Sequence, residues 1–232
     1  MKKLMLIVVA VVITACTKDQ IVAVASRTVT TPPIFKRVVI LGNSITYAPA
    51  DLFNGWYDNW GMAASAPDSD YVHRLTVYFQ RVDSSCTVNI RDIISFEKDW
   101  AKYDLDKNLA DLKALNPDLV ILRIGENVPV SLDTASFGKS YKALTQYFGA
   151  QAVVLGVGSF FPRPRTDAVM ARYSPNFISL ASIGKDPGNA AYGLWTNPGI
   201  EQHPCDKGMA KIADAIWAEV QYLTPIQTPA PR

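Results

Sequence analysis

The sequence has few of the residues that bind metal ions or nucleic acids. Among its 232 residues there are only two histidines, His73 and His203, and three cysteines. These residues are spread along the chain without forming a Cys/His cluster, so we expect no metal site. Charged residues make up only 19% of the chain, and they include no run of lysine or arginine. The sequence therefore argues against nucleic acid as a partner, and without a glycine-rich phosphate loop it predicts no cofactor.

Long apolar runs are also missing, and the run nearest the N terminus, residues 4–13, is too short for a membrane-spanning helix. Lys2 and Lys3 precede it, and Ile13-Thr14-Ala15-Cys16 follows it, which resembles a bacterial lipobox. We expect residues 1–15 to be a lipoprotein signal peptide. An ordinary signal peptide cut after Ala15, or a buried strand, are the alternatives.

The lipobox reading implies that Cys16 is lipidated and that the protein is exported and anchored to the cell envelope. We expect the outer membrane, with the periplasmic or surface face left open. Without Lys2 and Lys3, acidic and basic residues are equal in number. Residues 16–34, which include Pro32-Pro33, read as a tether, residues 35–223 as one domain, and residues 224–232 as a proline-rich tail.

Between the tether and the tail, apolar runs alternate with segments of helical periodicity. The expected strands are residues 37–41, 87–93, 119–124 and 152–157, with a fifth at 177–182; the expected helices are residues 70–82, 99–115, 134–148 and 206–223. Continuously apolar strands separated by helices are typical of a parallel sheet covered on both faces. The fold class predicted is α/β, a three-layer α/β/α sandwich with a parallel sheet of about five strands.

Two cysteines besides Cys16 lie within this domain. Cys86 precedes the second expected strand, whereas Cys205 lies beside a loop that we place at the opposite edge of the sheet. That separation exceeds the reach of a disulfide bond, so we do not expect the two cysteines to pair.

Polar motifs follow the expected strands, where ligands gather in such folds. Gly42-Asn43-Ser44-Ile45-Thr46 follows the first strand, Gly125-Glu126-Asn127 follows the third, and His203-Pro204 precedes the last helix. Each motif alone is also compatible with a turn or a helix cap. His203 is the better candidate for a base, because His73 lies inside an amphipathic helix and reads as structural.

In order and context, these motifs resemble blocks I, III and V of the SGNH (GDSL-type) hydrolases. The resemblance implies a flavodoxin-like fold with Ser44 as nucleophile and His203 as its base. It also implies an oxyanion hole that includes the backbone N–H of Ser44 and the side-chain amide of Asn127. Residues 59–65, 70–73 and 203–209 further resemble an exported bacterial subgroup of this family.

The sequence departs from the family pattern at the residue that orients the base. The family usually has an aspartate three residues before the histidine, and this position is Ile200. The orienting group is then Glu201, Glu126, Asp206 or a backbone carbonyl, and a Ser-His dyad is the working hypothesis.

A second departure concerns block II, where a glycine normally donates its N–H to the oxyanion. Residues 91–97 contain no glycine. Since any residue except proline can donate a backbone N–H, Ser95 or Phe96 can serve instead. Glu97 reads as a surface carboxylate at the start of the next helix or, alternatively, as a site residue.

The segment after the nucleophile is rich in aromatic residues and leaves the serine turn. Trp56, Tyr57 and Trp60, together with Glu126, are candidates for substrate binding. The alternative is that these rings pack the loop against the body of the domain.

The resemblance implies a serine esterase that removes small O-acyl groups, such as acetyl, from a glycan through an acyl-enzyme on Ser44. One alternative is an O-acyltransferase that uses the same residues; another is a catalytically degenerate scaffold that binds glycan. The partners expected are an acylated glycan or a small ester, with the membrane reached only through the lipid anchor. We expect a monomer.

Overall fold

The computed structural model describes residues 32–226. The expected signal peptide, Cys16 and most of the expected tether lie outside these residues, as does the end of the proline-rich tail. Across the described residues, no helix combines the length and the apolar character needed to cross a membrane.

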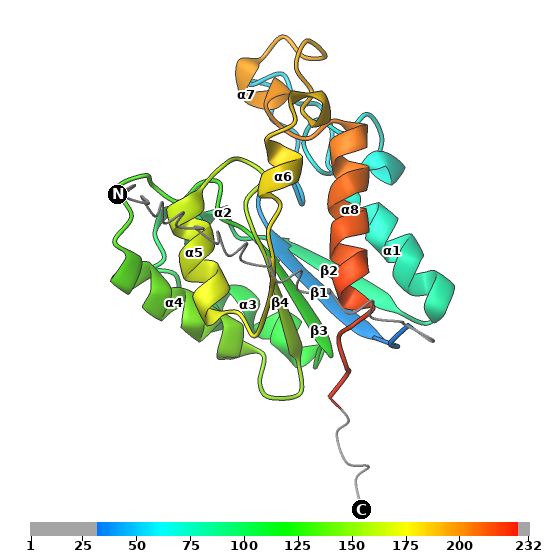
Figure 1. Ribbon diagram of the computed structural model, residues 1–232, viewed down its shortest axis with the longest axis vertical. Coiled ribbons are helices and arrows are strands. Elements are labelled where there is room, and N and C mark those ends of the chain that lie inside the picture. The colour runs from blue at the N-terminus through cyan, green and yellow to red at the C-terminus, as the bar shows by residue number, and fades with distance from the viewer. Residues whose placement is uncertain (1–31, 227–232) are drawn as a thin grey trace, which may run out of the picture. The chain divides into compact units, whose positions relative to one another are not determined.

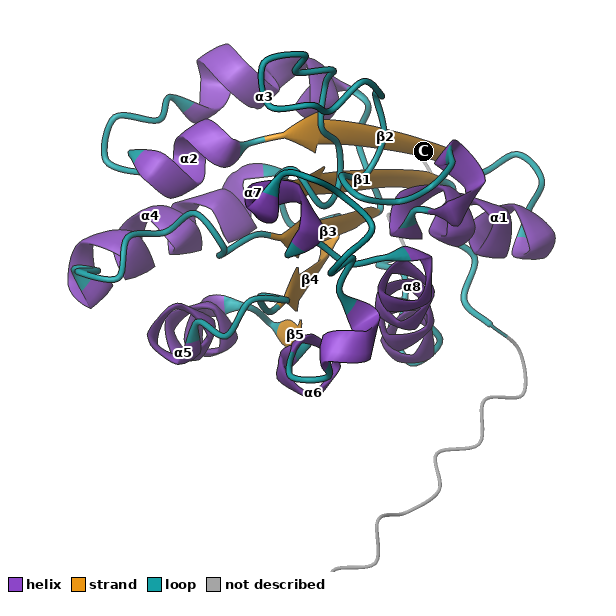
Figure 2. Cartoon of the chain, turned by 90° about the horizontal axis from the view of Figure 1, so that it is seen from above, coloured by secondary structure: helices purple, strands orange, loops and turns teal. Residues whose placement is uncertain are grey.

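A five-stranded parallel sheet forms the centre of the structure, with the strand order β2-β1-β3-β4-β5 (Figure 2). Its strands are β1 (Arg37–Gly42), β2 (Thr87–Asp92), β3 (Leu119–Arg123), β4 (Val153–Val157) and β5 (Asn176–Ile178). Gly42, at the end of β1, is in register with Asp92 of β2 and with Arg123 of β3. The residues that follow these three strands are therefore neighbours at one edge of the sheet.

Helices cover both faces of the sheet, which confirms the predicted α/β fold class. They are α1 (Tyr71–Val82), α2 (Ile94–Lys98), α3 (Leu105–Ala114), α4 (Thr134–Tyr147), α5 (Pro164–Tyr173), α6 (Ala181–Gly184), α7 (Pro198–Glu201) and α8 (Asp206–Val220). Figure 1 shows α1 and α8 on one side of the sheet and α4 and α5 on the other.

The alternating side chains of β1 explain the two layers of helices. Val38 and Ile40 point into a core formed with α1 and α8, whereas Val39 and Leu41 point into a core formed with α3, α4 and α5. All four side chains are completely buried. Both faces of the central strand are thus dry, as its continuous apolar sequence predicts.

The helices differ from the predictions at the start of α3 and in four helices that were not predicted, α2, α5, α6 and α7. Helix α6 takes the place of the end of the strand expected at residues 177–182, since β5 ends at Ile178. The helix expected at residues 99–115 begins only at Leu105, because the side chain of Asp104 accepts a hydrogen bond from the Lys107 N–H and caps a new helix start. The other expected helices agree with α1, α4 and α8 to within a few residues.

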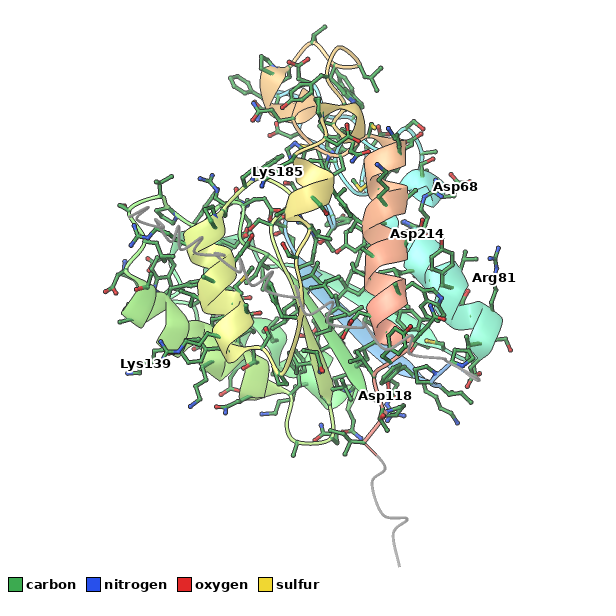
Figure 3. All side chains as sticks on the ribbon, in the orientation of Figure 1. Asp68, Arg81, Asp118, Lys139, Lys185 and Asp214 are labelled. Atoms are coloured by element: carbon green, nitrogen blue, oxygen red, sulfur yellow. The ribbon has the colours of Figure 1, made fainter. Side chains whose placement is uncertain are left out.

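The two ends of the parallel strands carry different residues. At the edge where the strands begin, the carboxylate of Asp118 accepts hydrogen bonds from the backbone N–H groups of Lys36 and Arg37, which ties β3 to β1. Figure 3 shows Asp118, and Figure 1, in the same orientation, shows α7 at the opposite end of the sheet. The edge where the strands end carries α7 and the loops around it, and the candidate residues gather there.

Candidate active site

Ser44 and His203 are in direct contact at the carboxyl-terminal edge of the sheet. Ser44 lies in the tight turn that follows β1, and His203 lies between α7 and α8. The Ser44 Oγ is 2.9 Å from the His203 Nε2, although the two residues are 159 positions apart in the chain. This geometry allows the imidazole to take the hydroxyl proton, as a nucleophile and its base require.

A backbone carbonyl orients the imidazole. The Nδ1 of His203 lies 2.8 Å from the carbonyl oxygen of Gly199, in α7. Because a carbonyl only accepts hydrogen bonds, Nδ1 carries the proton and the lone pair of Nε2 faces Ser44. Ile200, at the position where the hydrolases that the sequence resembles usually have an aspartate, is buried in an apolar cluster with Trp56.

The carboxylates considered for this orienting role bind elsewhere. Glu201 accepts a hydrogen bond from the Gly193 N–H, and Asp206 accepts two from Ser65. Glu126 binds Arg123. The geometry therefore corrects the expectation that Glu201 or Glu126 orients His203 and favours the backbone-carbonyl alternative.

The imidazole lies in a dry environment. Burial lowers the pKa of His203 to about 4, although the hydrogen bond to Gly199 acts in the opposite direction. The ring of Phe161 meets the imidazole edge to face, with 5.6 Å between the ring centroids. His203 is therefore neutral at neutral pH, which is the form that accepts a proton.

Backbone and side-chain N–H groups beside Ser44 form a candidate oxyanion hole. Among residues 32–226, the backbone N–H of Ser44 has no hydrogen-bond acceptor. The N–H of Phe96 donates to the Ile93 carbonyl at 2.8 Å, which argues against Phe96 as an oxyanion donor. The N–H of Ser95 lies in the first turn of α2, where helical N–H groups lack a preceding carbonyl partner.

Asn127 lies just past β3, and its side-chain amide is already oriented. Its Nδ2 donates one hydrogen bond of 2.7 Å to Glu97 Oε2, which leaves the second hydrogen of the amide for another acceptor. Glu97 is completely buried, which corrects the interpretation of this residue as a surface carboxylate.

Behind the nucleophile turn, a buried polar network connects the ends of β1 and β3. The Asn43 Nδ2 donates to Glu97 and, at 2.6 Å, to Glu126; the Asn43 Oδ1 accepts from Arg123 Nη1 at 2.8 Å. The Arg123 Nη2 also pairs with Glu126. Glu126 is 5% exposed, and its carboxylate is bound within this network. This corrects the expectation that Glu126 binds substrate; its role in the structure is to hold the network together.

Gly125 is required for this arrangement. Its φ of +130° is a conformation that L-residues rarely adopt, and an added Cβ would lie 2.4 Å from the Ser159 Oγ. The N–H of Gly125 donates to Glu97. Sequence reasoning identified the Gly-x-Asn motif but missed Arg123, although a single arginine inside an apolar strand signals a buried charge that needs a partner.

An open pocket of about 420 Å³ lies in front of Ser44. Its lining includes residues 47–52, Met62, Asp92 and Ile94. The N–H of Ile94 donates to the carboxylate of Asp92 at 2.8 Å, and burial raises the pKa of Asp92 above its ordinary value. This pocket is open space next to the Ser44 side chain.

The aromatic residues after the nucleophile divide into buried and exposed ones. Trp56 is completely buried, donates from Nε1 to the Ala48 carbonyl, and packs against Trp60 and Trp195. This corrects the expectation that Trp56 binds substrate. Trp60 is half-buried, with its Nε1 bonded to Ala64, whereas Tyr57 is 69% exposed. Tyr57 thus remains the candidate with a free ring face.

The cysteines and the other residues that can bind metal ions are dispersed in the described part of the chain. Residues 32–226 contain no group of three or more His, Cys, Asp or Glu side chains placed to hold a metal ion. Cys86 and Cys205 are free thiols.

No protein family model matches the sequence, and no curated protein is similar to it. A two-domain esterase active on acetylated mannans superimposes with a TM-score of 0.52 and 18% identity, over 84% of this chain and 52% of its own. This chain therefore spans about half the length of that esterase.

Two further solved structures match over nearly their whole length. The lipase/acylhydrolase from Enterococcus faecalis has a TM-score of 0.52 and 18% identity, over 83% of this chain and 100% of its own. A protein from Parabacteroides merdae ATCC 43184, named a GDSL-like lipase, has a TM-score of 0.51 and 14% identity, over 84% and 99%. At these identities the likeness concerns architecture, and this chain has the α/β/α fold of the GDSL/SGNH hydrolases.

Proposed function

We propose that this protein is a serine esterase in which Ser44 is the nucleophile and His203 is the general base. The contact between the Ser44 Oγ and the His203 Nε2 at 2.9 Å, with Nδ1 held by the Gly199 carbonyl, is the observation that supports this function most directly. The fold and the position of the pair at the carboxyl-terminal edge of the sheet agree with it.

The geometry supports a double displacement. His203 takes the proton of Ser44 as Oγ attacks the acyl carbonyl carbon, and the negative charge on the carbonyl oxygen is held by the Ser44 N–H and Asn127. His203 then gives the proton to the departing alcohol, leaving an acyl-enzyme. Water, deprotonated by His203, attacks this ester; His203 then returns the proton to the Ser44 Oγ as the acid leaves, which restores the free enzyme.

The absence of a carboxylate beside His203 has a chemical consequence. A neutral carbonyl fixes the tautomer of the imidazole but stabilises the imidazolium less than an ionised acid does. In enzymes with a complete triad, exchanging the aspartate for its neutral amide analogue lowers turnover by about 10⁴-fold, mainly through the wrong tautomer. Since Gly199 preserves the productive tautomer, we expect a working dyad.

For the substrate, we propose a small acyl group, such as acetyl, on a glycan. The open pocket beside Ser44 and the exposed ring of Tyr57 support this class, because a flat aromatic face can stack on a sugar ring. The structurally similar two-domain esterase is active on acetylated mannans, which makes acetylated mannan a sensible first glycan to test.

The test is hydrolysis of p-nitrophenyl acetate by the soluble domain, compared with Ser44→Ala and His203→Ala. We expect turnover by the wild type and background rates for both variants. A fluorophosphonate probe should add its mass to Ser44 in the wild type only. An inactive and unlabelled wild type, tested also on acetylated mannan, would overturn the proposal in favour of a glycan-binding scaffold. When a sugar is added as an acceptor, a transferase forms the acylated sugar, whereas a hydrolase forms only the free acid.

We also propose that the protein is a monomer exported and anchored through Cys16. The basic start, the short apolar run and the small residues before Cys16 support the anchor. Metabolic labelling with palmitate should mark the full chain and leave Cys16→Ser unlabelled. Equal labelling of both chains would contradict the anchor.

A further inference from the structure

A carboxylate buried next to the oxyanion site has no part in the dyad. Glu97, in α2, is completely buried and lies between the loop after β1 and the loop after β3. It accepts hydrogen bonds from Asn43 Nδ2, from the Gly125 N–H and from Asn127 Nδ2. All three partners are donors, so the ionised carboxylate, which only accepts, fits this position without a proton.

The contact with Asn127 constrains which end of that amide faces the site. An ionised Glu97 attracts the Nδ2 group and repels Oδ1, so one N–H of Asn127 binds Glu97 and the other is directed elsewhere. A protonated Glu97 can instead donate to Oδ1. The amide then turns over and presents its oxygen, which repels the negative charge of a tetrahedral intermediate.

We propose that Glu97 is a positioning residue that, when ionised, holds the Asn127 amide with its second N–H towards the oxyanion. This rests on the proposed esterase function. Glu97 does not touch the reacting atoms and acts through Asn127. Its protonation state thereby switches the oxyanion hole between a competent and an incompetent arrangement.

The charges around Glu97 bring this switch into the physiological pH range. Glu126, from the loop after β3, is a second buried carboxylate, and the nearby cation, Arg123 of β3, pairs with Glu126 and with the uncharged Asn43. Burial and the neighbouring Glu126 raise the pKa of Glu97 from its ordinary value towards neutral pH, against the effect of its three hydrogen bonds. Burial lowers that of His203 to about 4, so the two ionisations are well separated.

The experiment measures kcat and KM for p-nitrophenyl acetate from pH 5 to 9 in the wild type, Glu97→Gln, Asn127→Ala and the double variant. In the wild type we expect kcat to fall below pH 7. In Glu97→Gln we expect kcat above pH 7 to drop by about 10-fold or more, with little change in KM. We also expect kcat of this variant to stop changing with pH near pH 7. Glu219→Gln, on α8, removes a carboxylate far from this network and should retain the wild-type profile.

Asn127→Ala keeps the proposal testable even if Glu97→Gln folds poorly. Since Glu97 acts through Asn127, this variant should also lose the dependence near pH 7, and the double variant should be no slower than Asn127→Ala alone. The proposal would be overturned if kcat of Asn127→Ala still changed with pH near pH 7, or if the losses of kcat in the two single variants added up in the double variant. If the wild type neither hydrolyses esters nor labels at Ser44, the esterase function itself fails, which is a distinguishable outcome.

Discussion

The backbone carbonyl of Gly199 accepts a hydrogen bond from His203 Nδ1 at 2.8 Å, four residues before the histidine in the chain. This contact replaces a carboxylate by a neutral acceptor that belongs to the turn of α7 itself. The orientation of the base therefore depends on the fold of the short segment between residues 197 and 203, in which the Asn197 side chain caps α7 at the Gly199 N–H.

The low pKa of His203 can be measured directly, because the chain has only two histidines. In an NMR titration we expect the His203 imidazole to stay neutral until the pH approaches about 4. The folded state disfavours the proton, so stability is complete above the ordinary value of 6.5 and falls by on the order of 3 kcal/mol as the pH drops to 4. His73→Gln identifies the resonances, and a His203 midpoint near 6.5 would contradict the burial argument.

Trp56 and Tyr57 are adjacent in sequence but should respond oppositely to replacement by alanine. Trp56→Ala removes a completely buried indole, and we expect a loss of roughly 3–5 kcal/mol in the free energy of unfolding, measured in urea. Tyr57→Ala should leave this free energy nearly unchanged and raise KM for acetylated mannan. Equal KM values for Tyr57→Ala and the wild type would remove Tyr57 from the substrate site.

Gly125 and Gly55 both have positive φ angles but differ in their surroundings. Alanine at Gly55, at φ +79° with open space around it, should cost about 1 kcal/mol of stability from backbone strain alone. Alanine at Gly125 adds a clash with Ser159, and we expect a loss of roughly 2–5 kcal/mol together with a lower kcat. Similar losses of stability in the two variants would show that the contact with Ser159 adds no cost at Gly125.

Arg123 should be essential for stability because its removal leaves Glu126 without a counter-charge. We expect Arg123→Met to lower the free energy of unfolding by about 3–5 kcal/mol, and Arg123→Met/Glu126→Gln to lose less than the single variant. Lys102→Met, at an exposed ion pair with Asp99, serves as the control and should change nothing measurable. A double variant with a lower free energy of unfolding than Arg123→Met would refute this explanation.

The parts of the fold that follow from local apolar patterns were predictable. Val38 to Leu41 and Leu119 to Leu122 are buried on both sides, and their unbroken hydrophobicity predicts this. The start of α3 was misplaced at Asp99, although both local signals point to Leu105: the pattern of leucines begins there and the Asp104 side chain caps the helix.

The residues that support the site were less predictable, for two physical reasons. Glu97 is buried only because α2 packs against the loop after β3, and no local pattern encodes a contact between segments so far apart. The carbonyl of Gly199 is invisible in sequence, because every residue has one and only the backbone path decides its direction. Arg123 was visible as an anomaly in an apolar run, and Glu126 follows it by three residues, but its contact with Asn43 depends on the register of β1 and β3.

The distance in sequence between Ser44 and His203 also bears on how the protein matures. Ser44 lies in the turn after the central strand, whereas His203 directly precedes α8, the last helix among the described residues, which packs on the core beside that strand. Contacts of such long range are slow to form, because the entropy of closing the loop between them must be paid first. A nascent or refolding chain therefore has no functional nucleophile until its final helix has docked, and recovery of hydrolytic activity after dilution from urea would time the completion of the whole domain.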